Sequence, residues 1–172
     1  MATTPSSTSP AAQGFKPAFK RVQQTPGCGC DSALACIAMI AGKTLDEVRQ
    51  IAIDQFKHPR NGPFWITEDL IYKLLLHFGW VATVYKESTG ITSLPDLAIG
   101  MVEYNTETEL GRHVLFHRMA PAGSPKQTTE YIIDPAYWIP PSHHVRTEIK
   151  GFPIAWYIGV HPVNKPPVKA SQ

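Results

Sequence analysis

The sequence predicts an α+β domain, with helices in its first half and an antiparallel sheet in its second half. Residues 33–40 are small or apolar at every position, which is typical of a helix buried on all sides. Two further segments within residues 45–78 have apolar side chains at helical spacing. From residue 80 onward, stretches rich in β-branched and aromatic residues alternate with turns that contain Gly, Pro or Asn. Helices that precede the strands, rather than alternate with them, indicate an α+β architecture.

Composition indicates a single folded domain that is expected to bind neither nucleic acid nor membrane. The chain has 172 residues, 43% of them hydrophobic, which is enough for one domain with a core. A net charge of +2 is too small to predict nucleic-acid binding, and no apolar run is long enough to span a membrane. Neither partner is therefore expected. Three cysteines, Cys28, Cys30 and Cys36, lie close together, which argues against a disulfide scaffold and for a reducing compartment or a reactive thiol.

The two ends of the chain differ from the middle. Residues 1–16 are rich in Ser, Thr, Pro and Ala, so they are predicted to be a disordered leader, followed by a domain over 17–163 and a flexible tail over 164–172. The leader lacks the basic and apolar regions of a secretory signal and resembles the leaders of bacterial proteins exported by injection. The expected location is the cytoplasm, or a target cell reached without a cleaved signal peptide.

The first helix is the element around which the rest is arranged. It is predicted to begin at Cys30 or Asp31, with Asp31 or Ser32 capping its first N–H groups, and to end at Gly42.

Two more helices follow. Thr44 and a glutamate three residues later form a capping-box pattern for a helix over 45–53. Residues 56–64 contain two prolines and an Asn-Gly pair, so they are expected to form a loop. Thr67 is expected to cap the third helix, over 68–78.

The second half is predicted to be a sheet. Residues 93–97 are expected to form one helical turn, and 121–129 a hairpin loop with Pro and Gly. The predicted strands are 80–85, 98–104, 111–119, 130–134 and 153–160.

Three residues have types that suit thiol chemistry. Cys30 stands at a helix N-terminus, where the helix dipole lowers a thiol pKa from its usual value of about 8.5 and favours a nucleophilic thiolate. His113 begins one predicted strand and Asp134 ends the next, so a hairpin would bring the two ends together. A histidine activates a cysteine by proton transfer, and an acidic group orients the imidazole.

These residues carry a resemblance to a known family. Gln24 precedes Cys30 by six positions, His113 lies in Gly-Arg-His-Val-Leu, and Asp134 lies in Ile-Ile-Asp-Pro. The pattern, which covers about residues 20–160, resembles the papain-like cysteine peptidases of the bacteriocin-processing type, which cleave leader peptides after a double glycine. The resemblance implies a papain-like fold, with N-terminal helices packed on a C-terminal antiparallel sheet.

The resemblance also implies roles. Cys30 would be the nucleophile, His113 the general base and then acid, and Asp134 the orienting residue, while the side chain of Gln24 and the backbone N–H of Cys30 would bind the oxyanion. The expected function is a cysteine-dependent hydrolase that cleaves peptide or isopeptide bonds of a peptide or protein substrate through a thioester. A bacterial effector or toxin is one kind of protein in which such a hydrolase is expected. An inactive relative that binds a peptide or protein partner is one alternative, and a deamidase or transglutaminase-type acyl transferase is another. No cofactor is expected, and the spacing of the cysteines matches no closed zinc site.

The identity of the nucleophile stays open in the sequence. Asp31 follows Cys30 at a position where the family usually has glycine. An alignment without gaps over the first helix puts Ser32 in the nucleophile position, and Pro26 then replaces the glutamine. Cys28 is a third candidate for the nucleophile. Alternatively, Cys28 could have a redox role as a partner of Cys30.

Overall fold

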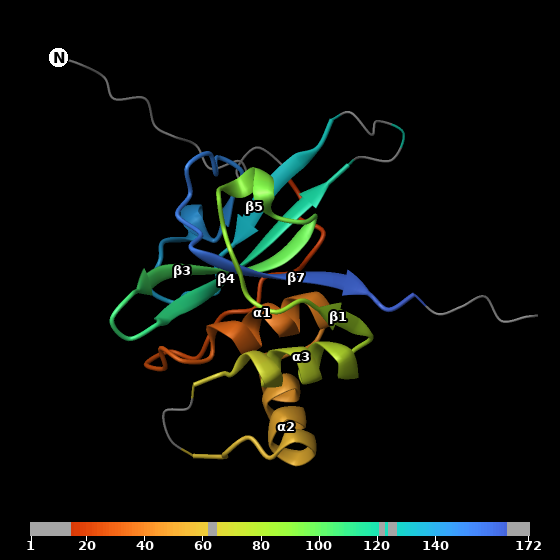
Figure 1. Ribbon diagram of the computed structural model, residues 1–172, viewed down its shortest axis with the longest axis vertical. Helices are drawn as coiled ribbons and strands as arrows, with labels where there is room; N and C mark the ends of the chain where they lie inside the picture. Colours follow the sequence, from red (N-terminus) through yellow and green to blue (C-terminus); the bar gives the residue numbers. More distant parts are fainter. Residues whose placement is uncertain (1–14, 62–64, 121–122, 124–126, 165–172) are drawn as a thin grey trace, which may run out of the picture.

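A computed structural model shows an α+β architecture, with helices on one side of an antiparallel sheet (Figure 1). The predicted leader 1–16 falls outside the described residues except for its last two positions, and the predicted tail 164–172 falls outside except for Asn164. Phe15 belongs to the folded part, because its ring packs edge-on against Tyr131 with centroids 5.2 Å apart. The structure describes residues 15–61, 65–120, 123 and 127–164.

The α-helices lie where the sequence predicts them, with small shifts at their ends. They are α1 Ser32–Ala41, α2 Leu45–Phe56 and α3 Glu68–His77. The structure also has the short 3₁₀ turns η2 Ile91–Ser93 and η3 Pro141–His143, and η3 was not predicted.

The strands form one seven-stranded sheet, in the order β1-β7-β3-β4-β5-β6, with β2 also pairing with β7. Every strand pair is antiparallel. The strands are β1 Trp80–Ala82, β2 Lys86–Glu87, β3 Leu97–Asn105, β4 Leu110–Met119, β5 Thr129–Ile133, β6 Val145–Arg146 and β7 Trp156–Pro162.

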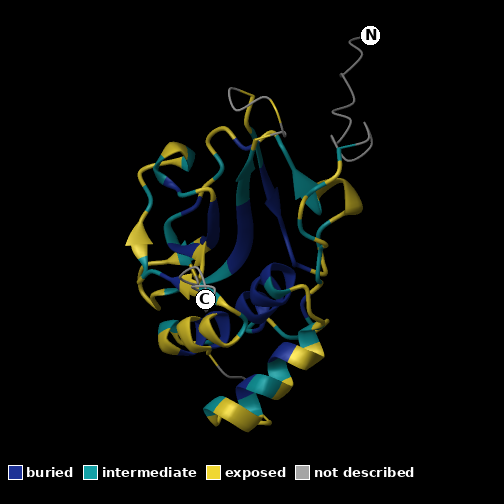
Figure 2. Ribbon diagram, turned by 90° about the vertical axis from the view of Figure 1, so that its right-hand side faces the viewer, coloured by how far each residue is buried: buried dark blue, intermediate teal, exposed yellow. Residues whose placement is uncertain are grey.

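The sheet buries both of its faces. Successive side chains of a strand point to opposite faces, so neighbouring strands form rows of residues on each side. One row belongs to the core that includes α1 and α3, and consists of Ile158, Ile99, Leu115 and Ile133. The row on the other face is covered by the segments around Leu94 and Ile154, and consists of Ala98, Phe116 and Ile132. Figure 2 shows that the buried residues are concentrated on α1 and the central strands.

Helix α1 is buried along almost its whole length, as predicted. Residues 32–40 are all buried, and Gly42 ends the helix with φ 66°, its N–H directed to the carbonyls of the last turn. The predicted cap is wrong, because the helix begins at Ser32 and the Asp31 side chain makes no capping hydrogen bond. The carboxylate of Asp31 instead accepts the backbone N–H of Thr25 and pairs with Arg49 at 3.0 Å.

The predicted caps of the other two helices are confirmed. Thr44 and Glu47 exchange both hydrogen bonds of a capping box, and Thr67 accepts the N–H of Leu70 at 3.2 Å. Helix α2 continues to Phe56, beyond its predicted end at residue 53, and closes on a left-handed residue.

Replacing Thr44 with alanine is expected to lower the free energy of unfolding by about 1 kcal/mol, because the backbone N–H of Glu47 loses the side-chain oxygen that accepts its hydrogen bond. Urea unfolding measures the change. The matched control is Thr106→Ala, since Thr106 is an exposed loop threonine. An equal effect of both substitutions would contradict a role of the capping box.

Apart from shifts of one to three residues at the ends of strands, of which the largest is the start of β7 at Trp156 instead of residue 153, the second half of the chain differs from the prediction in three places. The predicted strand 80–85 is divided into β1 and β2, which pair with different parts of β7. The helical turn predicted over 93–97 is the turn η2, and β3 has already begun at Leu97. Strand β6 was not predicted, because two residues are too short to show alternation.

Candidate active site

The first turn of α1 meets strand β4 at a serine and a histidine. Ser32 Oγ accepts a hydrogen bond from the backbone N–H of His113 at 3.0 Å and lies 3.3 Å from His113 Nδ1. His113 pairs with Met101 in the sheet and shares the parity of Leu115, so its side chain points to the face that α1 covers. Both residues are buried, with exposed fractions of 2% for Ser32 and 7% for His113.

The other ring nitrogen of His113 contacts a tyrosine. His113 Nε2 lies 2.7 Å from Tyr85 Oη. Burial lowers the pKa of His113 from 6.5 to about 4, so the imidazole is neutral near neutral pH. Burial also raises the pKa of Tyr85, with a further rise from the charge of Glu68, so the phenol keeps its proton. Two hydroxyl groups therefore flank one neutral imidazole.

The direction of the hydrogen bonds depends on which ring nitrogen carries the proton. In the tautomer protonated at Nε2, His113 donates to Tyr85 Oη and its bare Nδ1 accepts the proton of Ser32. That tautomer gives a hydroxyl nucleophile, a base and a group that orients the base, which is the arrangement used in nucleophilic catalysis.

Asp134 does not take the orienting position that the resemblance implies. Both carboxylate oxygens accept from Arg112 Nη1, at 2.7 and 2.8 Å, and Oδ1 also accepts the N–H of Ala136 at 2.9 Å. The reason is strand alternation: Leu115 pairs with Ile133, so Asp134 lies on the face opposite to the side chain of His113.

Arg112 and Asp134 form a buried charge pair beside the sheet. Asp134 is completely buried, and the Arg112 side chain is 11% exposed. Glu103, on the neighbouring strand, adds a second carboxylate 2.9 Å from Arg112 Nε, although that N–H does not point at it. The carboxylates raise the pKa of Arg112 despite its burial. This cluster holds one guanidinium between two carboxylates, and none of its three members is a hydroxyl or a thiol.

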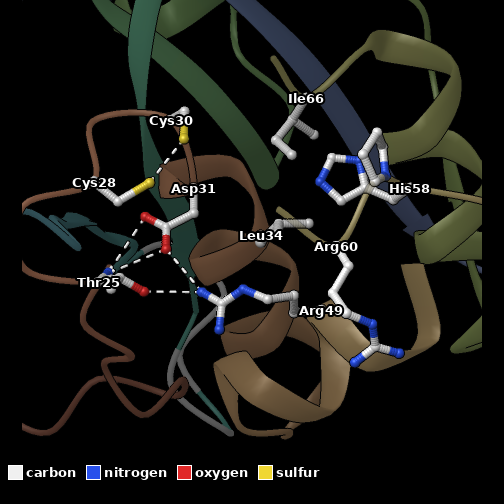
Figure 3. Close-up of a pocket in the computed structure, with 10 residues that line it drawn as sticks. Thr25, Cys28, Cys30, Asp31, Leu34, Arg49, His58, Arg60 and Ile66 are labelled. Atoms are coloured by element: carbon white, nitrogen blue, oxygen red, sulfur yellow. Dashed lines mark hydrogen bonds and ion pairs between the residues drawn. The ribbon is translucent and has the colours of Figure 1, made fainter. Parts of the chain in front are cut away.

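Cys30 lies two residues before Ser32, at the edge of a separate pocket (Figure 3). The Sγ atoms of Cys28 and Cys30 are 2.7 Å apart. The pocket has a volume of about 220 Å³, and neither Ser32 nor His113 is among the described residues that line it. Those residues are Thr25, Cys28, Cys30, Asp31, Leu34, Arg49, His58, Pro59, Arg60 and Ile66.

Gln24 holds the turn that carries the cysteines. Its Nε2 donates to the carbonyl of Cys28 at 2.9 Å, and its backbone N–H donates to Pro135 at 2.9 Å. The side chain is buried, and its Oε1 has no hydrogen-bond partner among the described residues. One of the two amide protons is thus used to fix the loop, and the other is not accounted for by a bond to a described residue.

No family model, curated protein or solved structure matches the chain. A function for this site must therefore be argued from its geometry alone. Across the described ranges, no helix is long and apolar enough to cross a membrane, and no three His, Cys, Asp or Glu side chains are grouped to hold a metal ion.

The structure brings together only part of the predicted site. His113 lies at the N-terminus of α1, as the resemblance implies, but its ring nitrogens contact Ser32 and Tyr85. No role was predicted for Tyr85 from the sequence. The one signal for it was a tyrosine inside an apolar segment, since a buried phenol needs a hydrogen-bond partner.

Proposed function

We propose that this domain is an acyl-transfer hydrolase that acts on peptide or isopeptide bonds, with Ser32 as its nucleophile and His113 as its base. The observation that carries the proposal is the contact of Ser32 Oγ with His113 Nδ1, with Tyr85 on the other ring nitrogen. A separation of 3.3 Å is within the looser range of such pairs before substrate binds.

The proposed reaction has two steps. His113 Nδ1 takes the Ser32 proton as Oγ attacks the carbonyl carbon, and the imidazolium then gives that proton to the leaving amine as the C–N bond breaks. Water, deprotonated by the same nitrogen, cleaves the ester on Ser32. A histidine with a pKa of about 4 is a weak base but a strong acid toward the leaving group.

The N-terminus of α1 supports the same chemistry. Its first N–H groups have no partner within the helix, and the helix dipole is positive there, so a developing oxyanion would be stabilised. The remaining amide proton of Gln24 is a second candidate donor. Deamidation and transamidation would use the same residues and differ only in the acceptor.

A second candidate function is a catalytically silent domain that binds a peptide or protein partner. The observation in its favour is the burial of both Ser32 and His113, which a substrate carbonyl would have to reach. The third candidate is the thiol hydrolase predicted from the sequence, with Cys30 as nucleophile. An experiment must distinguish it from the other two.

Labelling with a fluorophosphonate probe, followed by site assignment by mass spectrometry, tests the proposal. We expect the probe to label Ser32, and we expect the rate to fall by about 10²- to 10⁴-fold in His113→Gln. Ser142→Ala is the matched control, because Ser142 is an exposed serine in a surface turn. Circular dichroism confirms that each variant is folded.

The variant Ser32→Cys makes the test independent of serine reactivity. A thiol at this position would be alkylated rapidly by iodoacetamide, and the substitution His113→Gln would slow that reaction. If Cys30 of the wild-type chain reacts rapidly instead and depends on His113, the thiol hydrolase is correct and our assignment is wrong. If the reaction rate of neither Ser32 nor Cys30 depends on His113, the domain is a binding domain and not a hydrolase.

A further inference from the structure

The segment before α1 holds its first cysteine rigidly. The N–H of Cys28 donates to the carbonyl of Thr25 at 3.0 Å and closes a turn with Pro26 and Gly27 at its centre. Gly27 has φ 79°, the conformation that the third position of a type II turn requires. Gln24 binds the carbonyl of Cys28 from the other side. Cys28 is therefore fixed through both of its backbone polar groups.

The second cysteine is held by its neighbour. Asp31 follows Cys30 directly, and its carboxylate accepts the N–H of Thr25 at 3.2 Å and pairs with Arg49. These contacts tie the end of the loop back to its beginning. Only Gly29 separates the two cysteines, and beyond these three residues no heavy atom of the described part of the chain lies within 4 Å of the position that a Cβ on Gly29 would occupy.

The two thiols face each other across this closed loop (Figure 3). Their Sγ atoms are 2.7 Å apart, with a hydrogen bond between them, and both line the pocket described above. A disulfide needs sulfurs about 2.05 Å apart, so the two Sγ atoms must move closer together before the bond can form. Cys36, by contrast, is completely buried, and burial raises the pKa of its thiol.

We propose that Cys28 and Cys30 are a thiol–disulfide exchange site that is oxidised by a low-molecular-weight disulfide carrying carboxylates. The pocket beside the thiols supports this substrate class, because Arg60 lines it and Asp31, the one acid among its described lining residues, is neutralised by its ion pair with Arg49. The inference concerns the cysteines alone and does not depend on the function of Ser32.

The exchange balances in two steps. The thiolate of one cysteine attacks a sulfur of the small disulfide, forms a mixed disulfide and releases one thiolate. The other cysteine then attacks the protein sulfur of the mixed disulfide, forms the bond between Cys28 and Cys30 and releases the second thiolate. The two protons lost by the protein end on the two released thiols, and the two electrons reduce the small disulfide.

The bond should open and close without unfolding the domain. A disulfide stabilises a protein mainly by closing a loop in the unfolded chain, and a loop with one intervening residue is too short to contribute much. While the bond is closed, neither cysteine can act as a nucleophile, whereas the hydroxyl of Ser32 is unchanged.

Oxidised glutathione is the probe that tests the proposal on the full chain. After incubation, the remaining thiols are alkylated, and intact mass and peptide mapping assign every cysteine. We expect the wild-type chain to lose two hydrogens, to release two glutathione molecules and to keep only Cys36 open to alkylation after denaturation. Dithiothreitol should restore all the thiols.

Single substitutions provide the controls. In Cys28→Ser and Cys30→Ser, the remaining cysteine should hold one glutathione that is not released, whereas Cys36→Ala should behave like the wild type. The proposal is overturned if the wild-type chain keeps glutathione on Cys28 or Cys30, if its disulfide joins two chains or includes Cys36, or if no thiol reacts.

Discussion

Replacing Asp134 with alanine is expected to lower the free energy of unfolding by about 3–5 kcal/mol, the largest single loss predicted for this domain. The carboxylate is completely buried and binds Arg112 through both oxygens. Without it, Arg112 keeps a charge in a mostly buried place with only Glu103 beside it, and the N–H of Ala136 loses its acceptor. Urea unfolding at neutral pH measures the loss.

The matched control is an ion pair on the surface. Asp96 pairs with Arg118 at 3.3 Å, but its side chain is 80% exposed, so Asp96→Ala is expected to cost less than about 1 kcal/mol. Similar losses in the two variants would show that the buried pair is not structural in the way described.

A second substitution of Asp134 distinguishes its structural role from the role implied by the resemblance, which is to orient the imidazole of His113. In Asp134→Asn, molecules that remain folded should label at Ser32 as fast as the wild type, because the Asp134 side chain lies on the other face of the sheet from His113. If the labelling rate of Ser32 falls strongly while the fold stays intact, Asp134 does contribute to the active site.

Acid is expected to destabilise the domain through His113. The pKa of His113 is about 4 in the folded chain and near 6.5 when unfolded, so between these values the unfolded chain binds more protons. Stability from this group is complete above about pH 6.5 and is lost as the pH falls toward about 4. The shift corresponds to about 3 kcal/mol in total, of which about 2 kcal/mol is lost by about pH 5.

Urea unfolding of the wild type and His113→Gln at about pH 7.5 and about pH 5 measures this effect. The variant should lose about 2 kcal/mol less between the two conditions, because glutamine does not titrate. His161→Gln, at an exposed position of β7, should follow the wild type. If all three proteins lose the same stability, His113 is not the buried group that responds to acid.

The helices and the order of helices and strands could be predicted from local sequence patterns. The buried nature of α1 follows from a run of small and apolar residues, and the first residues of α2 and α3 follow from Thr44 and Thr67. These features are local, since a cap depends on residues three positions apart. The order of helices before strands was enough to predict an α+β architecture.

The first residue of α1 could not be predicted from the sequence, because it depends on a contact from outside the helix. Asp31 is a good capping residue by its type, and a helix that it capped by its side chain would fit the sequence equally well. Its carboxylate is instead drawn to Arg49, on the next helix, and to Thr25. That long-range pairing accompanies a helix that begins at Ser32 and leaves Cys30 in the preceding loop beside Cys28.

The tertiary structure alone decided which side chains meet His113. The sequence predicts that His113 lies near the start of one strand and Asp134 at the end of the next, but it does not predict how the two strands are aligned. Because side chains alternate, a shift of one residue between β4 and β5 would exchange the faces of β5 and put Asp134 on the side of His113. In the observed register Leu115 pairs with Ile133, so Asp134 binds Arg112, and His113 contacts Ser32 and Tyr85.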